Sequence, residues 1–220
     1  MGDQRYVGNC AQECLLKEFA STAMARATFY YDLGSPYAYL AAERLGVLRE
    51  RAQEPVQWRP VSLGGLFKLA GRSSWSLGDP KRRREGMAEV ERRAGLYGLP
   101  EVRWPDPWPS NYLMAMRAAT FAYRAGRGHE FTMRAFRASF AEGLDLGIPA
   151  HVLQAAERAG LDPAEVERAT EDPEVKLALR EATDAAHGAG VFGVPTIAVD
   201  DNLFWGEDRL DEAASLLASR

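Results

Sequence analysis

The chain has little cysteine and histidine, and it lacks any long apolar segment. Only two cysteines (Cys10 and Cys14) and three scattered histidines occur among 220 residues. Two cysteines cannot form a disulfide scaffold or a four-cysteine zinc site, and none of the histidines has the spacing of metal ligands. No apolar run approaches the roughly 20 residues that a membrane-spanning helix needs. We therefore expect no metal site and no membrane span.

A basic excess is also missing. The chain has 27 basic and 31 acidic residues and a net charge of −4, whereas proteins that bind nucleic acid usually carry a surplus of positive charge. Residues 1–23 lack the basic region and apolar stretch of a secretory signal. The length suits one sizeable core or one domain with a large insertion. We expect a cytoplasmic protein that binds neither nucleic acid nor a membrane.

Residues 1–26 are interpreted as an extension before the first strand. A strand pattern begins directly after Met24, Ala25 and Arg26, so Met24 resembles a true start. The spacing of Cys10 and Cys14 fits one turn of helix. We interpret these cysteines as small residues in a variable tail.

The first folded segment has the pattern of a strand, a helix and a second strand. Residues 27–31 are aromatic and β-branched, which is typical of a strand. Ser35 and Pro36 then favour a helix start, because serine caps helices and proline is preferred at the first helical position. Residues 56–61 alternate like a second strand. Such a unit predicts two parallel strands with a right-handed crossover.

Helical patterns dominate the middle of the chain. Strand residues return only at positions 194–199, followed by a turn and a return strand at 203–205. The sequence therefore predicts an α/β domain made of residues 27–62 and 187–220. An all-helical insertion, residues 63–186, divides it.

Three positions could contribute to a binding site. Ser35 lies at a predicted helix N-terminus, where free N–H groups and the helix dipole stabilise an anion and lower the pKa of a sulfur placed there. Val194 precedes Pro195, which starts a strand and favours a cis peptide bond; the Val194 backbone could then pair with an extended, peptide-like ligand. Asp208 lies in the expected first turn of the last helix. Each position also has a purely structural interpretation, as a helix cap, an edge-strand proline and a dipole cap respectively.

Two long motifs resemble one known family. These are residues 30–40 (YYDLGSPYAYL) and the closing stretch formed by 190–196 (GVFGVPT) and 203–210 (LFWGEDRL). Segments 63–68 and 104–111 are similar too. Together they resemble the 2-hydroxychromene-2-carboxylate isomerases and the kappa-class glutathione transferases, in the DsbA branch of the thioredoxin superfamily. The resemblance covers about residues 27–218.

The resemblance implies a thioredoxin-like fold with a large all-helical insertion, with glutathione held between the two parts. Ser35 matches the serine that activates the glutathione sulfur. Val194, before the cis proline Pro195, matches the residue that pairs with the cysteinyl backbone. Asp208 matches the acid that holds the γ-glutamyl end, and Lys68 matches a lysine that lines the site, although it could equally be a solvated lysine.

The same resemblance places Tyr37, Trp108 and Asn111 at the substrate cavity, with simple core packing as the other interpretation of Trp108. Two positions depart from the family. Arg72 stands where many relatives have an asparagine that contacts glutathione. Arg72 could bind a carboxylate as a forked donor. Alternatively, the thiol cofactor could be one other than glutathione. Tyr112 stands where relatives often have serine.

The turn before the first helix also argues against redox activity. Thioredoxin-type oxidoreductases have two cysteines at the positions of Ser35 and Ala38, and dithiol exchange needs both thiolates. The resemblance instead implies a glutathione-dependent isomerase that acts, as a homodimer, on a small aromatic or electrophilic substrate. A glutathione transferase and a non-catalytic thiol-binding protein are the alternatives, and the cofactor is glutathione or another low-molecular-weight thiol.

Overall fold

The computed structural model describes residues 26–46, 48, 50 and 55–219. The predicted extension up to residue 25, with both cysteines, lies outside these residues. The strands are β1 (Ala27–Tyr31), β2 (Val56–Pro60), β3 (Thr196–Val199) and β4 (Asn202–Trp205). The helices are α2 (Pro36–Arg44), α4 (Leu63–Leu69), α5 (Pro80–Leu96), α6 (Leu113–Arg124), α7 (Gly128–Phe140), α8 (Pro149–Arg158), α9 (Pro163–Glu171), α10 (Pro173–Gly188) and α11 (Leu210–Ala218). There are also two 3₁₀ turns, η1 (Trp75–Leu77) and η2 (Glu207–Arg209).

The strands form one mixed sheet in the order β2-β1-β3-β4. Strands β1 and β2 are parallel, as the strand–helix–strand pattern predicts, with Phe29 opposite Trp58. Strand β3 runs antiparallel to β1, and β4 returns beside β3 as a hairpin. Between β2 and β3 the described elements are all helical, so the chain has a thioredoxin-like fold with a large helical insertion.

Serine or aspartate followed by proline starts four of the helices. The side chains of Ser35, Asp79, Asp162 and Asp172 each accept a backbone N–H from the first turn of their helix. A capping oxygen satisfies a donor that the helix leaves unpaired, and a proline directly after it has no N–H to lose. These local rules explain why the starts of α2, α9 and α10 were predictable from sequence.

Two of the boundaries that differ from the sequence prediction lie on either side of the β3–β4 hairpin. Strand β3 begins at Thr196 and not at Val194, because Pro195 has no N–H to donate to a ladder. The segment after β4 is a 3₁₀ turn, and α11 begins only at Leu210. Asp208 therefore lies in the η2 turn between β4 and α11, and not in the first turn of an α-helix.

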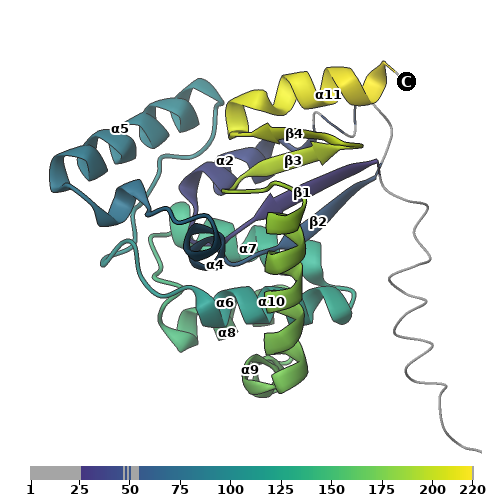
Figure 1. Cartoon of the computed structure of the whole chain (residues 1–220). Coiled ribbons are helices and arrows are strands. Elements are labelled where there is room, and N and C mark those ends of the chain that lie inside the picture. The colour runs from purple at the N-terminus through teal and green to yellow at the C-terminus, as the bar shows by residue number, and fades with distance from the viewer. Residues whose placement is uncertain (1–25, 47, 49, 51–54, 220) are drawn as a thin grey trace, which may run out of the picture.

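The core joins the sheet to the inserted helices. One continuous cluster of buried side chains includes Phe29 and Tyr31 from β1, Tyr39 from α2 and Phe136 from α7. The Tyr31 hydroxyl and Thr132 Oγ1 lie 2.7 Å apart in a buried hydrogen bond between the sheet and α7. Helix α11 packs on β3 and β4, whereas α10 packs on β2 and α4. Figure 1 shows α6 to α9 gathered beyond the β2 edge, with α5 reaching out beside α2.

None of the helices in the described residues is long and apolar enough to cross a membrane.

Candidate active site

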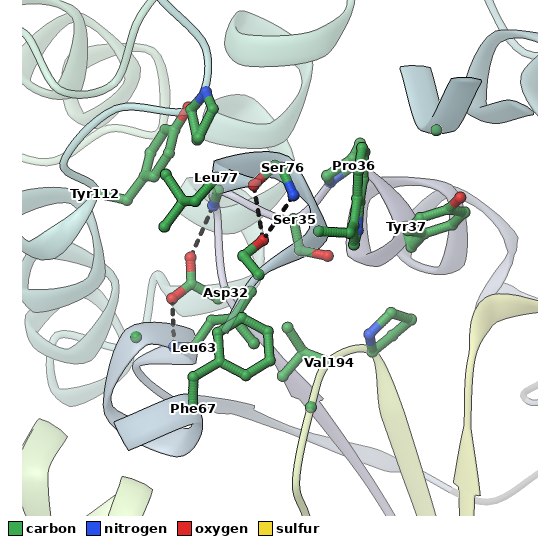
Figure 2. Close-up of a pocket in the computed structure, with 18 of the residues that line it drawn as sticks. Asp32, Ser35, Pro36, Tyr37, Leu63, Phe67, Ser76, Leu77, Tyr112 and Val194 are labelled. Atoms are coloured by element: carbon green, nitrogen blue, oxygen red, sulfur yellow. Dashed lines mark hydrogen bonds between the residues drawn. The ribbon is translucent and has the colours of Figure 1, made fainter. Parts of the chain in front are cut away.

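A cavity of about 850 Å³ opens where the sheet meets the inserted helices. Its wall includes the turn between β1 and α2, the first residues of α4, one side of α5, the loop before α6, the loop before β3 and the η2 turn. Figure 2 shows Ser35, Tyr37, Leu63, Tyr112 and Val194 around this space. The cavity thus receives residues from segments that lie far apart in the sequence.

Ser35 lies at the N-terminus of α2 and lines the cavity. Its side chain is buried, and its Oγ accepts a hydrogen bond of 3.2 Å from the Ala38 N–H. The Ser35 N–H itself is bonded to the Asp32 carbonyl oxygen at 3.0 Å. Pro36 carries no N–H, and the hydroxyl of Ser35 is a donor that this turn can offer to an anion in front of the helix.

Val194 and Pro195 line the same cavity, and the peptide bond between them is cis. The Pro195 carbonyl accepts a hydrogen bond of 2.9 Å from the Gly206 N–H. Gly206 has a φ of +112°, and a Cβ at this position would lie 2.4 Å from Asp208 Oδ1. A glycine is therefore needed for the η2 turn to follow β4 directly and place Asp208 at the cavity.

Asp208 lines the cavity as part of a cluster of charges. Its Oδ2 lies 3.6 Å from Nη1 of Arg93, on α5, and its side chain is 57% exposed. The same Nη1 donates to Glu207 Oε1 at 2.5 Å, and Arg93 Nε donates to Glu89 at 2.7 Å. Hydrogen bonds from Arg92 and Arg93 lower the pKa of Glu89 to about 2. The cluster joins the inserted helix α5 to the η2 turn.

Aromatic side chains form another part of the cavity wall. Tyr37, Trp75 and Trp108 all line it, and their rings follow one another at centroid distances of 6.2 and 5.5 Å. Trp108 is only 8% exposed, so it also belongs to the hydrophobic core. Asn111 lines the cavity and accepts the Leu113 N–H at 3.1 Å, at the start of α6. Such a surface suits a flat apolar molecule.

Two of the residues expected at the site, Lys68 and Arg72, do not line this cavity. On α4 the lining residues are Leu63, Gly64 and Phe67. Lys68 follows Phe67 by about 100° around the helix and is exposed. The Arg72 guanidinium lies 5.0 Å from the centroid of the Phe192 ring, outside the lining.

Asp32 is a buried carboxyl in the cavity wall that the sequence interpretation did not select. Its Oδ1 accepts the Gly34 N–H at 2.8 Å, and its Oδ2 accepts the Leu63 N–H at 2.7 Å (Figure 2). The carboxylate therefore fastens the turn before Ser35 to the start of α4. Burial raises the pKa of Asp32 to about 6, although the two backbone hydrogen bonds lower it.

Sequence reasoning also missed Arg93, Glu207 and Trp75. Glu207 stands inside a quoted motif, beside Asp208, but nothing in its neighbours indicates that it is buried. Arg93 lies in a helix crowded with exposed arginines, and only the fold distinguishes it from them. No group of three or more metal-binding side chains occurs among the described residues.

The sheet order, the helical insertion and the cavity beside the cis proline define a protein of the thioredoxin-like class. The family model of the DSBA-like thioredoxin domain matches residues 27–218. The chain belongs to this family, and within it to the group of 2-hydroxychromene-2-carboxylate isomerases and kappa-class glutathione transferases.

Curated relatives carry both activities. A 2-hydroxychromene-2-carboxylate isomerase of Sphingobium xenophagum is 31% identical over 193 residues, which cover 86% of this chain and 96% of the relative. Human glutathione S-transferase kappa 1 is 27% identical over 216 residues, which cover 87% of this chain and 90% of the relative. A solved 2-hydroxychromene-2-carboxylate isomerase superposes with a TM-score of 0.74 at 25% identity, covering 88% of this chain and 94% of that structure. The family therefore includes isomerases and glutathione transferases.

Proposed function

We propose that the protein is a glutathione-dependent isomerase of the 2-hydroxychromene-2-carboxylate isomerase type. The observation that carries the proposal is the meeting of Ser35, Val194 and Asp208 at one cavity, although they lie on three separate segments. Capping α2 and starting a strand are local roles that do not by themselves require these three residues to line one cavity. The relatives named above support the same reaction class.

The groups around the cavity suit a peptide-like thiol. Ser35 offers a hydroxyl donor at a helix N-terminus, the main chain at Val194 offers peptide groups, and Asp208 offers a carboxylate to an ammonium group. When bound, glutathione supplies a thiol that adds reversibly to a conjugated double bond. The aromatic wall of the cavity would hold the second molecule.

The chain's own contribution is electrostatic and positional. The Ser35 hydroxyl donates a hydrogen bond to a negatively charged sulfur, and the N-terminus of α2 favours the same charge. Trp75 and Trp108 orient a flat substrate and exclude water from it.

A kappa-class type of transferase is the second candidate, because relatives with that name match about as much of the chain. The two activities differ in thiol balance. An isomerase regenerates every thiol that it uses, whereas a transferase consumes one thiol for each product molecule. A thermal-shift screen over low-molecular-weight thiols identifies the cofactor, and assays with a chromene carboxylate and with an electrophilic aromatic halide then separate the reactions. A melting shift with glutathione but no turnover in either assay would contradict both and indicate a binding protein.

Asp208→Asn is expected to weaken glutathione binding by about 1.5 kcal/mol, the lower end for a hydrogen bond to a charged group. The lower end applies because the Asp208 carboxylate is half-exposed and shares the Arg93 guanidinium with Glu207. The melting temperature should change little, since the side chain is not part of the core. Calorimetry with the wild type and the variant measures the difference. Equal affinities would mean that Asp208 does not contact the thiol.

A further inference from the structure

Ser110 lies in the loop before α6 and lines the cavity beside Asn111. Its hydroxyl donates a hydrogen bond to Oδ1 of Asp145, which lies in the loop between α7 and α8. The same Oδ1 accepts the Gly147 N–H at 2.7 Å. Because a backbone N–H can only donate, this oxygen is an acceptor, and the proton of the first hydrogen bond belongs to Ser110.

The loop between α7 and α8 holds this hydrogen bond in place. Asp145 is only 7% exposed. Its carbonyl oxygen accepts the Ile148 N–H at 3.1 Å and lies 2.8 Å from His151 Nδ1, on α8. A Cβ on Gly147 would lie 2.7 Å from Ser110 Oγ and 3.0 Å from Asp145 Oδ1, so the close approach of these two side chains depends on glycine at this position. The Ser110 hydroxyl is therefore fixed in one orientation.

The fixed orientation leaves the Ser110 oxygen with acceptor capacity. A hydroxyl has one proton and two lone pairs, and the proton is directed to Asp145. The neighbouring Tyr112 hydroxyl is buried and makes no hydrogen bond. Burial raises the pKa of Tyr112 to about 12, and nearby Ser110 lowers it in part. Even a hydrogen bond from Tyr112 would occupy only one of the two lone pairs. Ser110 thus offers an acceptor to the cavity, and its donor is already used.

We propose that Ser110, fixed by Asp145, is a specificity-determining residue that accepts a hydrogen bond from a hydroxyl group on the aromatic substrate. This inference rests on the proposed function and deepens it, because it names the group of the substrate that is recognised. Trp108, two residues earlier, provides the aromatic surface for the ring itself. A substrate without a donor displaces water from the Ser110 oxygen and leaves it unpaired, and such a loss is a strong basis for rejecting an analogue.

The test compares the binding of 2-hydroxycinnamate and 2-fluorocinnamate by calorimetry, because fluorine is close to hydroxyl in size but cannot donate. Ser110→Ala removes the acceptor. Asp145→Asn is the conservative variant, since its side-chain oxygen can still accept from Ser110 and Gly147. The matched control is Ser215→Ala, which removes an exposed hydroxyl on α11 that donates to the Asp211 carbonyl at 2.8 Å and does not line the cavity.

The wild type, Ser215→Ala and Asp145→Asn are expected to prefer the hydroxyl ligand by about tenfold. Ser110→Ala should bind the two ligands about equally, with little change in its affinity for the fluoro ligand. A retained preference in Ser110→Ala, or equal losses for both ligands, would overturn the inference. So would a wild type that shows no preference or binds neither ligand. Loss of the preference in Asp145→Asn would assign it to the negative charge and not to the fixed hydroxyl, which also contradicts the inference.

Circular dichroism establishes that Ser110→Ala folds. Should it not, Ser110→Ala with Asp145→Asn removes the same hydroxyl without leaving a buried carboxylate short of a partner, and it should likewise lose the preference. The binding test uses no thiol. Failure of the proposed function, seen as absent turnover of a chromene carboxylate with glutathione, is therefore observed separately from failure of this inference.

Discussion

Ser35→Ala should lower turnover at pH 7 by about a hundredfold or more, the usual cost of removing a hydrogen bond to a charge on which catalysis depends. The hydroxyl of Ser35 is a donor that the turn can offer to the sulfur, whereas Pro36 has no N–H and the Ala38 N–H is bonded to Ser35 Oγ. The dipole of α2 remains in the variant, so some activity should persist.

The pH dependence separates this role from simple helix capping. Without the hydroxyl, the pKa of the bound thiol should rise, and each unit corresponds to about 1.4 kcal/mol of lost thiolate stabilisation. Activity should therefore recover partly as the pH rises, because the thiolate then forms unaided. Ultraviolet titration of bound glutathione measures the pKa directly. Identical titration curves for wild type and variant would reduce Ser35 to a helix cap.

A second capping residue provides the control. Asp162 caps α9 by accepting the Ala164 N–H at 2.9 Å, and it does not line the cavity. Asp162→Ala and Ser35→Ala should each lower the free energy of unfolding by about 1 kcal/mol. Only the Ser35 variant should change the pKa of the bound thiol.

Local sequence rules identified the parts of the site that depend on local structure. Ser35 could be selected because serine before proline at a strand-to-helix turn indicates a helix N-terminus, and α2 begins there. Val194 could be selected because Pro195 ends the ladder at that point. Both residues line the cavity. The family resemblance then added Tyr37, Trp108 and Asn111, which line it too.

Contacts between distant segments were beyond the reach of the sequence patterns. Arg93 and Glu207 are separated by 114 positions, and their pairing depends on how α5 crosses the η2 turn. Lys68 shows the converse problem. The rotation of α4 about its own axis sends Phe67 to the cavity and leaves Lys68 outside the lining. Periodicity gives the apolar face of a helix and not the neighbour that this face meets.

Asp32 lies between these two cases. Its place, three residues before Ser35, is visible in the sequence, but its burial is not. The tertiary contact that matters is the hydrogen bond from the Leu63 N–H, which comes from the start of α4. Tyr112 covers the same turn, with its ring 2.4 Å from where a Cβ of Gly34 would lie. The carboxyl is therefore enclosed by a segment some 80 residues away.

Asp32 should make the folded protein less stable as the pH rises from about 4 to about 6. Burial raises the pKa of this carboxyl from 3.8 to about 6 in the folded state, so the folded chain holds a proton that the unfolded chain has lost. The free energy of unfolding then falls as the pH rises, by about 2 kcal/mol between pH 4 and pH 7.5, and this contribution is constant at higher pH. Asp32→Asn cannot titrate, so the difference in unfolding free energy between wild type and variant should shift by that amount between pH 4 and pH 7.5. Urea unfolding at both pH values measures the shift. A shift in the opposite direction would mean that the hydrogen bonds from Gly34 and Leu63, which favour the ionised carboxylate, outweigh its burial.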